Sequence, residues 1–171
     1  MIWFVLASMA VMAMYVAAVI LREGVPYSIS ATYYKLERPG WFSGCIAASA
    51  VLVLPPVLEL GDPAWSFFGF IGVGGMLFVA FVPKFKEELE GKVHISSAIC
   101  CVAGSQLWVL ANMSWLLIAW AVWIIYTLIY MSYNVSGSLW YDFRRSKPMF
   151  WVEMVSLFTV YASLIFKCVT S

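Results

Sequence analysis

Long apolar segments separated by short polar loops account for almost the whole chain. Six of these segments have about the 20 apolar residues that a helix needs to cross the hydrocarbon core of a bilayer. We expect membrane spans at about 2–21, 41–60, 64–82, 93–111, 115–134 and 148–166 of the 171 residues. The pattern therefore predicts an all-α polytopic membrane protein, a six-transmembrane-helix bundle that forms a single membrane domain over 1–171.

The division of the longest uncharged stretch into two spans follows from its length. As one helix, Val93 to Tyr133 would measure about 60 Å, which is twice the thickness of the hydrocarbon core. The only polar break near its middle runs from Asn112 to Ser114. We place the turn between the fourth and fifth spans there.

Prolines and glycines mark the second and third spans. Pro55 and Pro56 lie inside the second span, and we expect them to kink the helix or end it early because proline removes backbone donors. Glycine allows helices in a membrane to approach closely. We therefore expect packing contacts at the glycines of the third span, which are Gly69, Gly72, Gly74 and Gly75.

Basic residues lie almost entirely in the first, third and fifth loops. The nine of them are Arg22, Lys35, Arg38, Lys84, Lys86, Lys92, Arg144, Arg145 and Lys147. The other side holds only Lys167, beside Glu59 and Asp62. The positive-inside rule then predicts cytoplasmic odd loops and both termini outside, in the inner membrane of a prokaryote or an equivalent bilayer.

Composition supports a membrane protein and narrows its partners. Hydrophobic residues make up 64% of the chain, against about 45–50% in soluble domains. The net charge is +1 without a basic tail, so we expect no nucleic-acid partner. The cysteines lie in apolar segments without a CxxC motif, and we expect them to stay unpaired and to bind no metal. They are Cys45, Cys100, Cys101 and Cys168. We expect no cofactor.

One face of the fourth span collects most of its polar groups. At 100° per residue, a narrow stripe contains His94, Ser97, Cys101, Ser105, Trp108 and Asn112. Polar side chains in a span face the interior of the bundle, because lipid offers them no partners. The stripe predicts either hydrogen bonds between helices or the lining of a polar pathway.

Two ionisable residues are candidates for chemistry. His94, the only histidine, ends the charged run that begins at Pro83 and titrates near physiological pH. It could act as an acid or base, bind a ligand, or be structural. Glu153 lies inside the sixth span, where ionisable residues are functional hypotheses by default. Alternatively, Glu153 reaches the interface or pairs with a basic residue of the fifth loop (Arg144, Arg145 or Lys147).

The first loop, 24–40, has the composition of an interfacial segment. Its tyrosines suit the headgroup layer, where amphipathic rings prefer to lie, and it has room for a short interfacial helix. Its candidate binding residues are Tyr27, Ser28, Ser30 and Tyr33.

Two short motifs carry a family resemblance. The segment 26–31 (PYSISA) after the first span, followed by a lone histidine opening a later helix at 93–98 (VHISSA), is similar to the six-helix DRAM and GPI-lipid-remodelling group, which is distantly ceramidase-like. The resemblance implies lipid involvement. It departs from the ceramidase-like enzymes, which hold zinc with several histidines, because this chain has only His94. It also departs in topology, because charge places Ser28 and Ser30 inside, whereas the family places this segment outside.

Three functions remain open. The leading hypothesis is a channel-like or translocation pathway lined by the fourth span, in a homo-oligomer surrounded by membrane lipids. The first alternative is a membrane-embedded enzyme or binding protein that acts on lipid headgroups at the cytoplasmic face, through His94 with Glu153, Tyr33 or Ser30. The second is a membrane scaffold or effector that acts through partner proteins.

Overall fold

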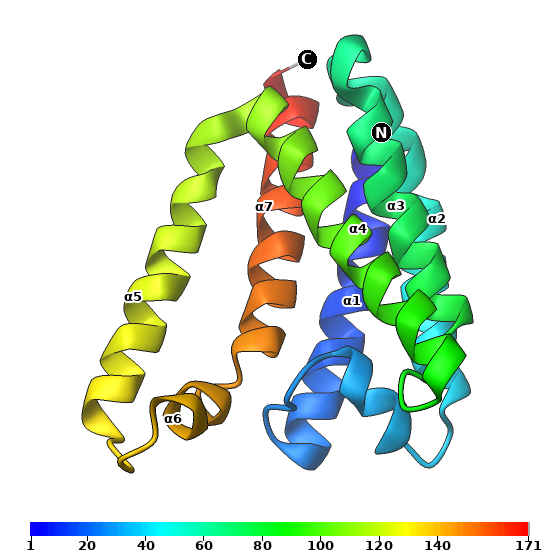
Figure 1. The fold of residues 1–171 in the computed structure, drawn as a ribbon. Helices are drawn as coiled ribbons and strands as arrows, with labels where there is room; N and C mark the ends of the chain where they lie inside the picture. The colour runs from blue at the N-terminus through cyan, green and yellow to red at the C-terminus, as the bar shows by residue number, and fades with distance from the viewer. Residues whose placement is uncertain (171) are drawn as a thin grey trace.

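The chain folds into a bundle of long helices joined by loops that contain short helices. The structure is a computed structural model that describes residues 1–170. The long helices are α1 (Ile2–Glu23), α2 (Gly40–Leu60), α3 (Ser66–Phe81), α4 (Glu88–Met113), α5 (Ile118–Tyr133) and α7 (Pro148–Thr170) (Figure 1). The short ones are η1 (Ser30–Tyr34), η2 (Pro63–Trp65), η3 (Ser114–Leu117) and α6 (Leu139–Arg145). Residues 1–170 contain no strand, so the predicted all-α class is confirmed.

The long helices have the length and composition of membrane spans. Five helical segments in the described part of the chain are long and apolar enough to cross a bilayer. One of them, Glu88–Tyr133, covers 46 residues. The chain turns back within it at η3, so that α4 and α5 meet at one end of the molecule and diverge toward the other (Figure 1). The turn falls at the polar break that the sequence indicates, and the helices are consistent with an integral membrane protein.

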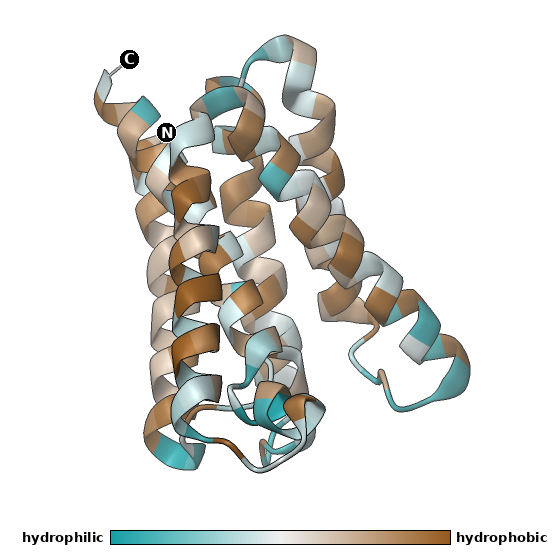
Figure 2. Cartoon of the chain, turned by 60° about the vertical axis from the view of Figure 1, so that its left-hand side comes forward, coloured by the Kyte–Doolittle hydropathy of each residue, from teal (hydrophilic) through white to brown (hydrophobic). Residues whose placement is uncertain are grey.

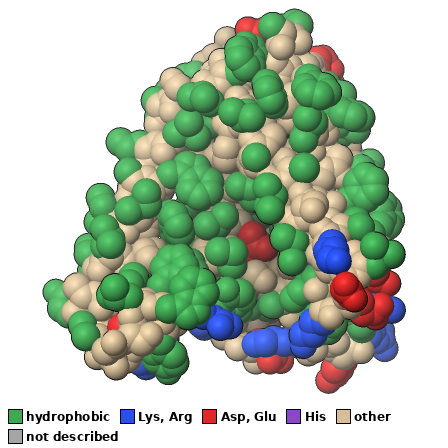
Figure 3. All heavy atoms as spheres, in the orientation of Figure 1, with side chains coloured by type: hydrophobic (Ala, Val, Ile, Leu, Met, Phe, Trp, Pro, Cys, Tyr) green, Lys and Arg blue, Asp and Glu red, His purple; other side chains and the backbone are tan. Residues whose placement is uncertain are grey.

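The two ends of the bundle differ in charge. The helices alternate in direction, and both termini lie at the same end in both views (Figures 1 and 2). The loops 24–39, 82–87 and 134–147 lie at the opposite end, which we call the basic end. Lysine and arginine side chains gather there along the lower edge of Figure 3. Hydrophilic residues are concentrated in the same loops, whereas the helices between the ends are mostly hydrophobic (Figure 2).

Helices α3 and α4 approach backbone to backbone. A Cβ atom added to Gly75 would lie 2.6 Å from the Cys101 amide nitrogen and 2.6 Å from the Ser97 carbonyl oxygen. Gly69 and Gly72 are similarly enclosed, whereas a Cβ atom on Gly74 would meet nothing within 4 Å. The packing expectation is therefore right for three of the four glycines and wrong for Gly74.

Helix α2 continues through both of its prolines to Leu60. The helix therefore does not end early at Pro55 or Pro56, whereas a kink there stays a prediction. Each proline removes one backbone donor, but neighbouring helices can compensate for this in a membrane bundle. Pro56 is fully buried in the bundle, and packing against α1 and α3 holds the helical conformation past it.

Two polar clusters tie the long helices together. Ser8 of α1, Ser49 of α2 and Tyr161 of α7 form a buried triangle, in which the three hydroxyl oxygens are 2.7, 2.8 and 2.9 Å apart. In the second cluster, the amide oxygen of Gln106 in α4 accepts hydrogen bonds from Trp120 Nε1 at 2.9 Å and from Thr159 Oγ1 at 3.0 Å. The second cluster attaches α5 to α4 and α7.

Candidate functional site

A cavity of about 120 Å³ lies in the centre of the bundle, between α1, α2, α3, α4 and α7. Its walls are almost entirely apolar, with side chains such as Met12, Phe42, Val73 and Leu157. Glu153 is the only Asp or Glu among the lining residues. Figure 3 shows the molecule hollowed near the middle of this face, with acidic surface (red) at the floor of the hollow and hydrophobic side chains (green) around it.

Glu153 lies in the second turn of α7 and is held by the loop that follows α1. The Ile29 amide nitrogen donates to its Oε2 at 2.5 Å. The Ser30 hydroxyl donates to its Oε1 at 3.5 Å, a long hydrogen bond. Both oxygens of the carboxylate therefore face donors from one short segment. Ser30 itself also lines the cavity.

The start of α7 fixes this loop in place. The Phe150 amide, one of the first-turn donors that a helix leaves without an internal partner, donates to the Tyr27 carbonyl at 3.0 Å. The Lys147 ammonium donates to the Val25 carbonyl. These contacts hold Ile29 against Glu153, so the position of the carboxylate depends on the whole segment.

No cation neutralises Glu153 within the part of the chain that the structure describes. No Lys or Arg nitrogen of residues 1–170 lies within 4.0 Å of its carboxylate. Lys147 is bound to a carbonyl, and the Arg144 guanidinium lies over the Tyr27 ring, 5.9 Å from its centroid. The expected alternative of an ion pair with Arg144, Arg145 or Lys147 is therefore wrong. The physical reason is that backbone and ring contacts hold the nearby cations outside the cavity.

His94 is buried but does not line the cavity. Its Nδ1 donates to the Val82 carbonyl at 2.7 Å, and its ring centroid lies 5.3 Å from that of Phe85. Its Nε2 is buried and has no partner among residues 1–170. These contacts fasten the loop 82–87 to the first turns of α4. An acid–base role for His94 stays a prediction.

The polar stripe of α4 divides between packing and the cavity. Cys101, Ser105 and Trp108 line the cavity. Ser97 packs through its backbone against Gly75 of α3. Asn112 accepts a hydrogen bond from the Asp62 amide at 2.9 Å and thereby fastens the turn between α2 and α3. The stripe thus contributes to contacts between helices at some positions and to the cavity wall at others, and a polar pathway stays a prediction.

The other candidate residues of the first loop, Tyr27, Ser28 and Tyr33, contact neighbouring protein groups and do not line the cavity. The buried Ser28 accepts from the Ala31 amide at 3.0 Å at the start of η1, the short helix that the sequence allowed. The exposed Tyr27 lies under Arg144. Tyr33 packs edge-on against Phe42, a cavity residue, with ring centroids 6.1 Å apart.

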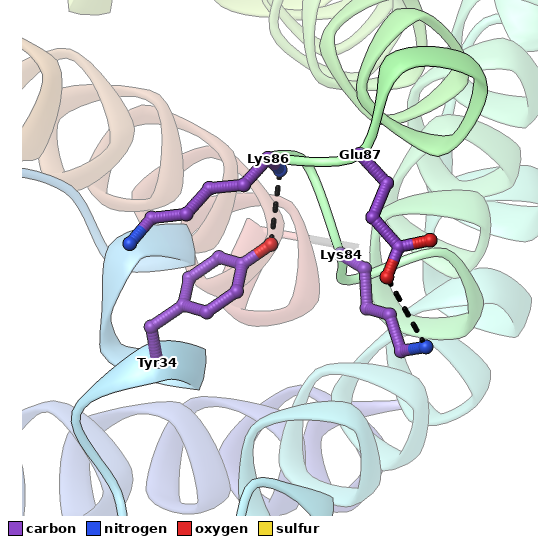
Figure 4. A network of polar contacts seen from close by, with 4 residues as sticks. All are labelled: Tyr34, Lys84, Lys86 and Glu87. Carbon is purple, nitrogen blue, oxygen red and sulfur yellow. Dashed lines mark hydrogen bonds and ion pairs between the residues drawn. The ribbon is translucent and has the colours of Figure 1, made fainter.

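The charged run before α4 forms a local network at the surface of the basic end. The Lys84 ammonium lies 3.4 Å from the Glu87 carboxylate, and this hydrogen bond raises the pKa of Lys84. The Lys86 amide donates to the Tyr34 hydroxyl at 2.9 Å (Figure 4). The network links this loop to η1 and lies apart from the cavity. The Lys84–Glu87 ion pair is formed within the loop itself.

Residues 1–170 contain no group of three His, Cys, Asp or Glu side chains that could hold a metal ion. All four cysteines are free. The candidate site consists of the Glu153 carboxylate, the Ser30 hydroxyl and the apolar cavity that both residues line. This chemistry can bind an amphipathic molecule, with its apolar part between the helices and its polar part at Glu153.

Comparison of the chain with protein-family models, with curated proteins and with solved structures found no match. The resemblance to the DRAM and GPI-lipid-remodelling group stays a prediction.

Proposed function

We propose that this integral membrane protein binds the apolar chain of an amphipathic, lipid-like molecule in its central cavity. The polar head of the molecule lies at Glu153 and Ser30, toward the basic end. The observation that carries the proposal is a cavity with apolar walls and a single carboxylate. This proposal develops the binding alternative rather than the pathway hypothesis.

The chemistry of the walls favours an apolar occupant over water. Empty apolar cavities in proteins stay dry, and one of about 150 Å³ binds benzene. A polar pathway would need hydrogen-bond donors and acceptors along its length. Three of the five pathway candidates on α4 (His94, Ser97 and Asn112) do not line the cavity. Pathway function therefore stays a prediction, with Cys101 and Ser105 as its cavity-lining members.

The volume supports a single chain of modest length. The cavity of about 120 Å³ is of the same order as one that binds a small apolar molecule such as benzene, so it suits the apolar chain of one molecule rather than a bulky multi-chain lipid. The hollow in Figure 3 offers access from the side of the bundle. Such a route suits a molecule that is already dissolved in the bilayer.

The enzymatic version of this alternative has partial support. The geometry brings Ser30 and Glu153 together, whereas His94 and Tyr33 have other partners. The location in an inner membrane, the cytoplasmic orientation of the basic end and a homo-oligomeric state also belong to the proposal. The charge difference between the two ends supports the orientation.

A cavity-filling substitution tests the proposal. Ala98 lines the cavity, and Ala103 on the same helix is exposed. We expect Ala98→Phe to abolish retention of one decanol molecule per protein, because the ring occupies the space of the chain. Ala103→Phe should retain it. The measurement is native mass spectrometry of protein released from nanodiscs equilibrated with decanol. Equal retention by both variants, or none by the unaltered protein, would contradict the proposal.

A further inference from the structure

We propose that the head of the bound molecule is a primary ammonium group, so that the preferred ligand is a single-chain alkyl amine. The inference rests on the proposed function and names the chemical class of its ligand. The structural feature behind it is the Glu153 carboxylate, which faces the apolar cavity without a cation from residues 1–170.

The first argument concerns charge. A carboxylate removed from water is costly unless an opposite charge or several hydrogen bonds compensate it. Here the compensation consists of the Ile29 amide at 2.5 Å, the Ser30 hydroxyl at 3.5 Å and the Ser30 backbone amide, none of which carries a positive charge. A ligand cation would supply the missing charge. An anionic head would instead be repelled by Glu153, which is the only ionisable carboxylate in the cavity wall.

The second argument concerns hydrogen bonds. Each carboxylate oxygen has two acceptor positions, so four positions face three protein donors, which are the Ile29 amide and the amide and hydroxyl of Ser30. The Ser30 oxygen also keeps acceptor capacity when its own hydrogen points to Glu153. A primary ammonium has three donors, which match the remaining position on the carboxylate and the acceptor positions of the Ser30 hydroxyl.

The third argument separates primary from quaternary ammonium groups. Quaternary heads have no N–H donor and are recognised by cages of aromatic rings. The polar contacts at Glu153 come instead from backbone amides and a hydroxyl. The geometry therefore favours a head that donates hydrogen bonds.

The basic residues of the rim do not compete for the carboxylate. Lys147 donates to the Val25 carbonyl and Arg144 lies over the Tyr27 ring. These contacts hold both cations away from Glu153. An ammonium that enters from the bilayer thus meets an acceptor site without displacing an ion pair.

The test compares three probes with the same ten-carbon chain: decylamine, decyltrimethylammonium and decanol. Binding to the full-length protein in nanodiscs at pH 7 is measured with radiolabelled probes and expressed against the mole fraction of probe in the bilayer. We expect decylamine to bind about 10- to 100-fold more tightly than the other two, because a hydrogen bond to a charged group contributes that factor.

The variant Glu153→Gln should reduce the affinity for decylamine to that for decanol and leave decanol unchanged. The matched control is Glu88→Gln, since the Glu88 side chain is 89% exposed, and it should change nothing. Equal binding of decylamine and decanol by the unaltered protein would overturn the inference and leave the proposed function intact. Equal binding of decyltrimethylammonium and decylamine would overturn the choice of a primary amine. Binding of none of the three probes would overturn the proposed function itself. The comparison of probes on the unaltered protein stands even if Glu153→Gln does not fold.

Discussion

Replacing Trp108 by alanine is expected to lower the free energy of unfolding by about 3–5 kcal/mol, the range for deletion of a large buried aromatic side chain. Trp108 is 1% exposed and is the largest of the fully buried side chains. Its indole packs on Gly61 and Gly69, where an added Cβ atom would lie 2.6 and 2.8 Å from its atoms.

The same substitution should also change the length of the alkyl chain that the protein binds. Trp108 lines the cavity and lies on α4 about 21 Å along the axis from His94 at the basic end. It therefore closes the end of the cavity that is far from the head site. We expect Trp108→Ala to retain alkyl chains longer than the unaltered protein holds. Unfolding with a denaturing detergent and native mass spectrometry measure the two effects.

Trp115→Ala provides the matched control, because Trp115 is 62% exposed on η3. Its loss should change the free energy of unfolding by less than about 0.5 kcal/mol, as is usual for exposed positions. If Trp108→Ala is equally mild, or if its preference for chain length does not change, Trp108 does not form the end wall of the cavity.

The second large effect is expected at the contact between α3 and α4. Gly75→Ala should lower the free energy of unfolding by about 1–3 kcal/mol, the usual cost of overpacking. The new methyl group would lie 2.6 Å from backbone atoms of Ser97 and Cys101. Backbone cannot rotate away as a side chain can, so the two helices must separate. Cavity volume should change with them, because Cys101 lines the cavity.

Gly74→Ala is the control on the same helix, one residue away. A Cβ atom there meets nothing within 4 Å, and alanine favours helix over glycine by about 1 kcal/mol. We expect no loss of stability, measured by the same unfolding assay. Equal destabilisation by the two variants would show that glycine matters for the helix itself rather than for the contact.

The sequence predicts the helical architecture well because membrane spans follow from simple counts. Apolar length indicates the long helices, and the polar break at 112–114 indicates the turn between α4 and α5. The sequence misses α6, because seven residues with mixed polarity in a loop carry no clear period. It also gives too much weight to Pro55 and Pro56, since local propensity ignores the support from neighbouring helices.

The site is less predictable, because its contacts join distant segments. The sequence singles out Glu153 and Ser30 separately, but their contact spans 123 positions. Helical periodicity groups His94 with Ser105, yet only Ser105 lines the cavity, since the bundle covers each part of the α4 stripe differently. Gln106 is not predicted to take part, although an amide within an uncharged span is a signal for hydrogen-bonding partners on neighbouring helices.

The central claim is that an apolar chain lies in the cavity with its head at Glu153. The most direct measurement is photolabelling with decylamine that carries a diazirine at its last carbon, followed by mapping of the labelled residue. The account predicts labelling at the far end of the cavity, on Val57, Gly69 or Trp108. Labelling confined to exposed side chains of α4, such as Ile99 or Leu110, would contradict it.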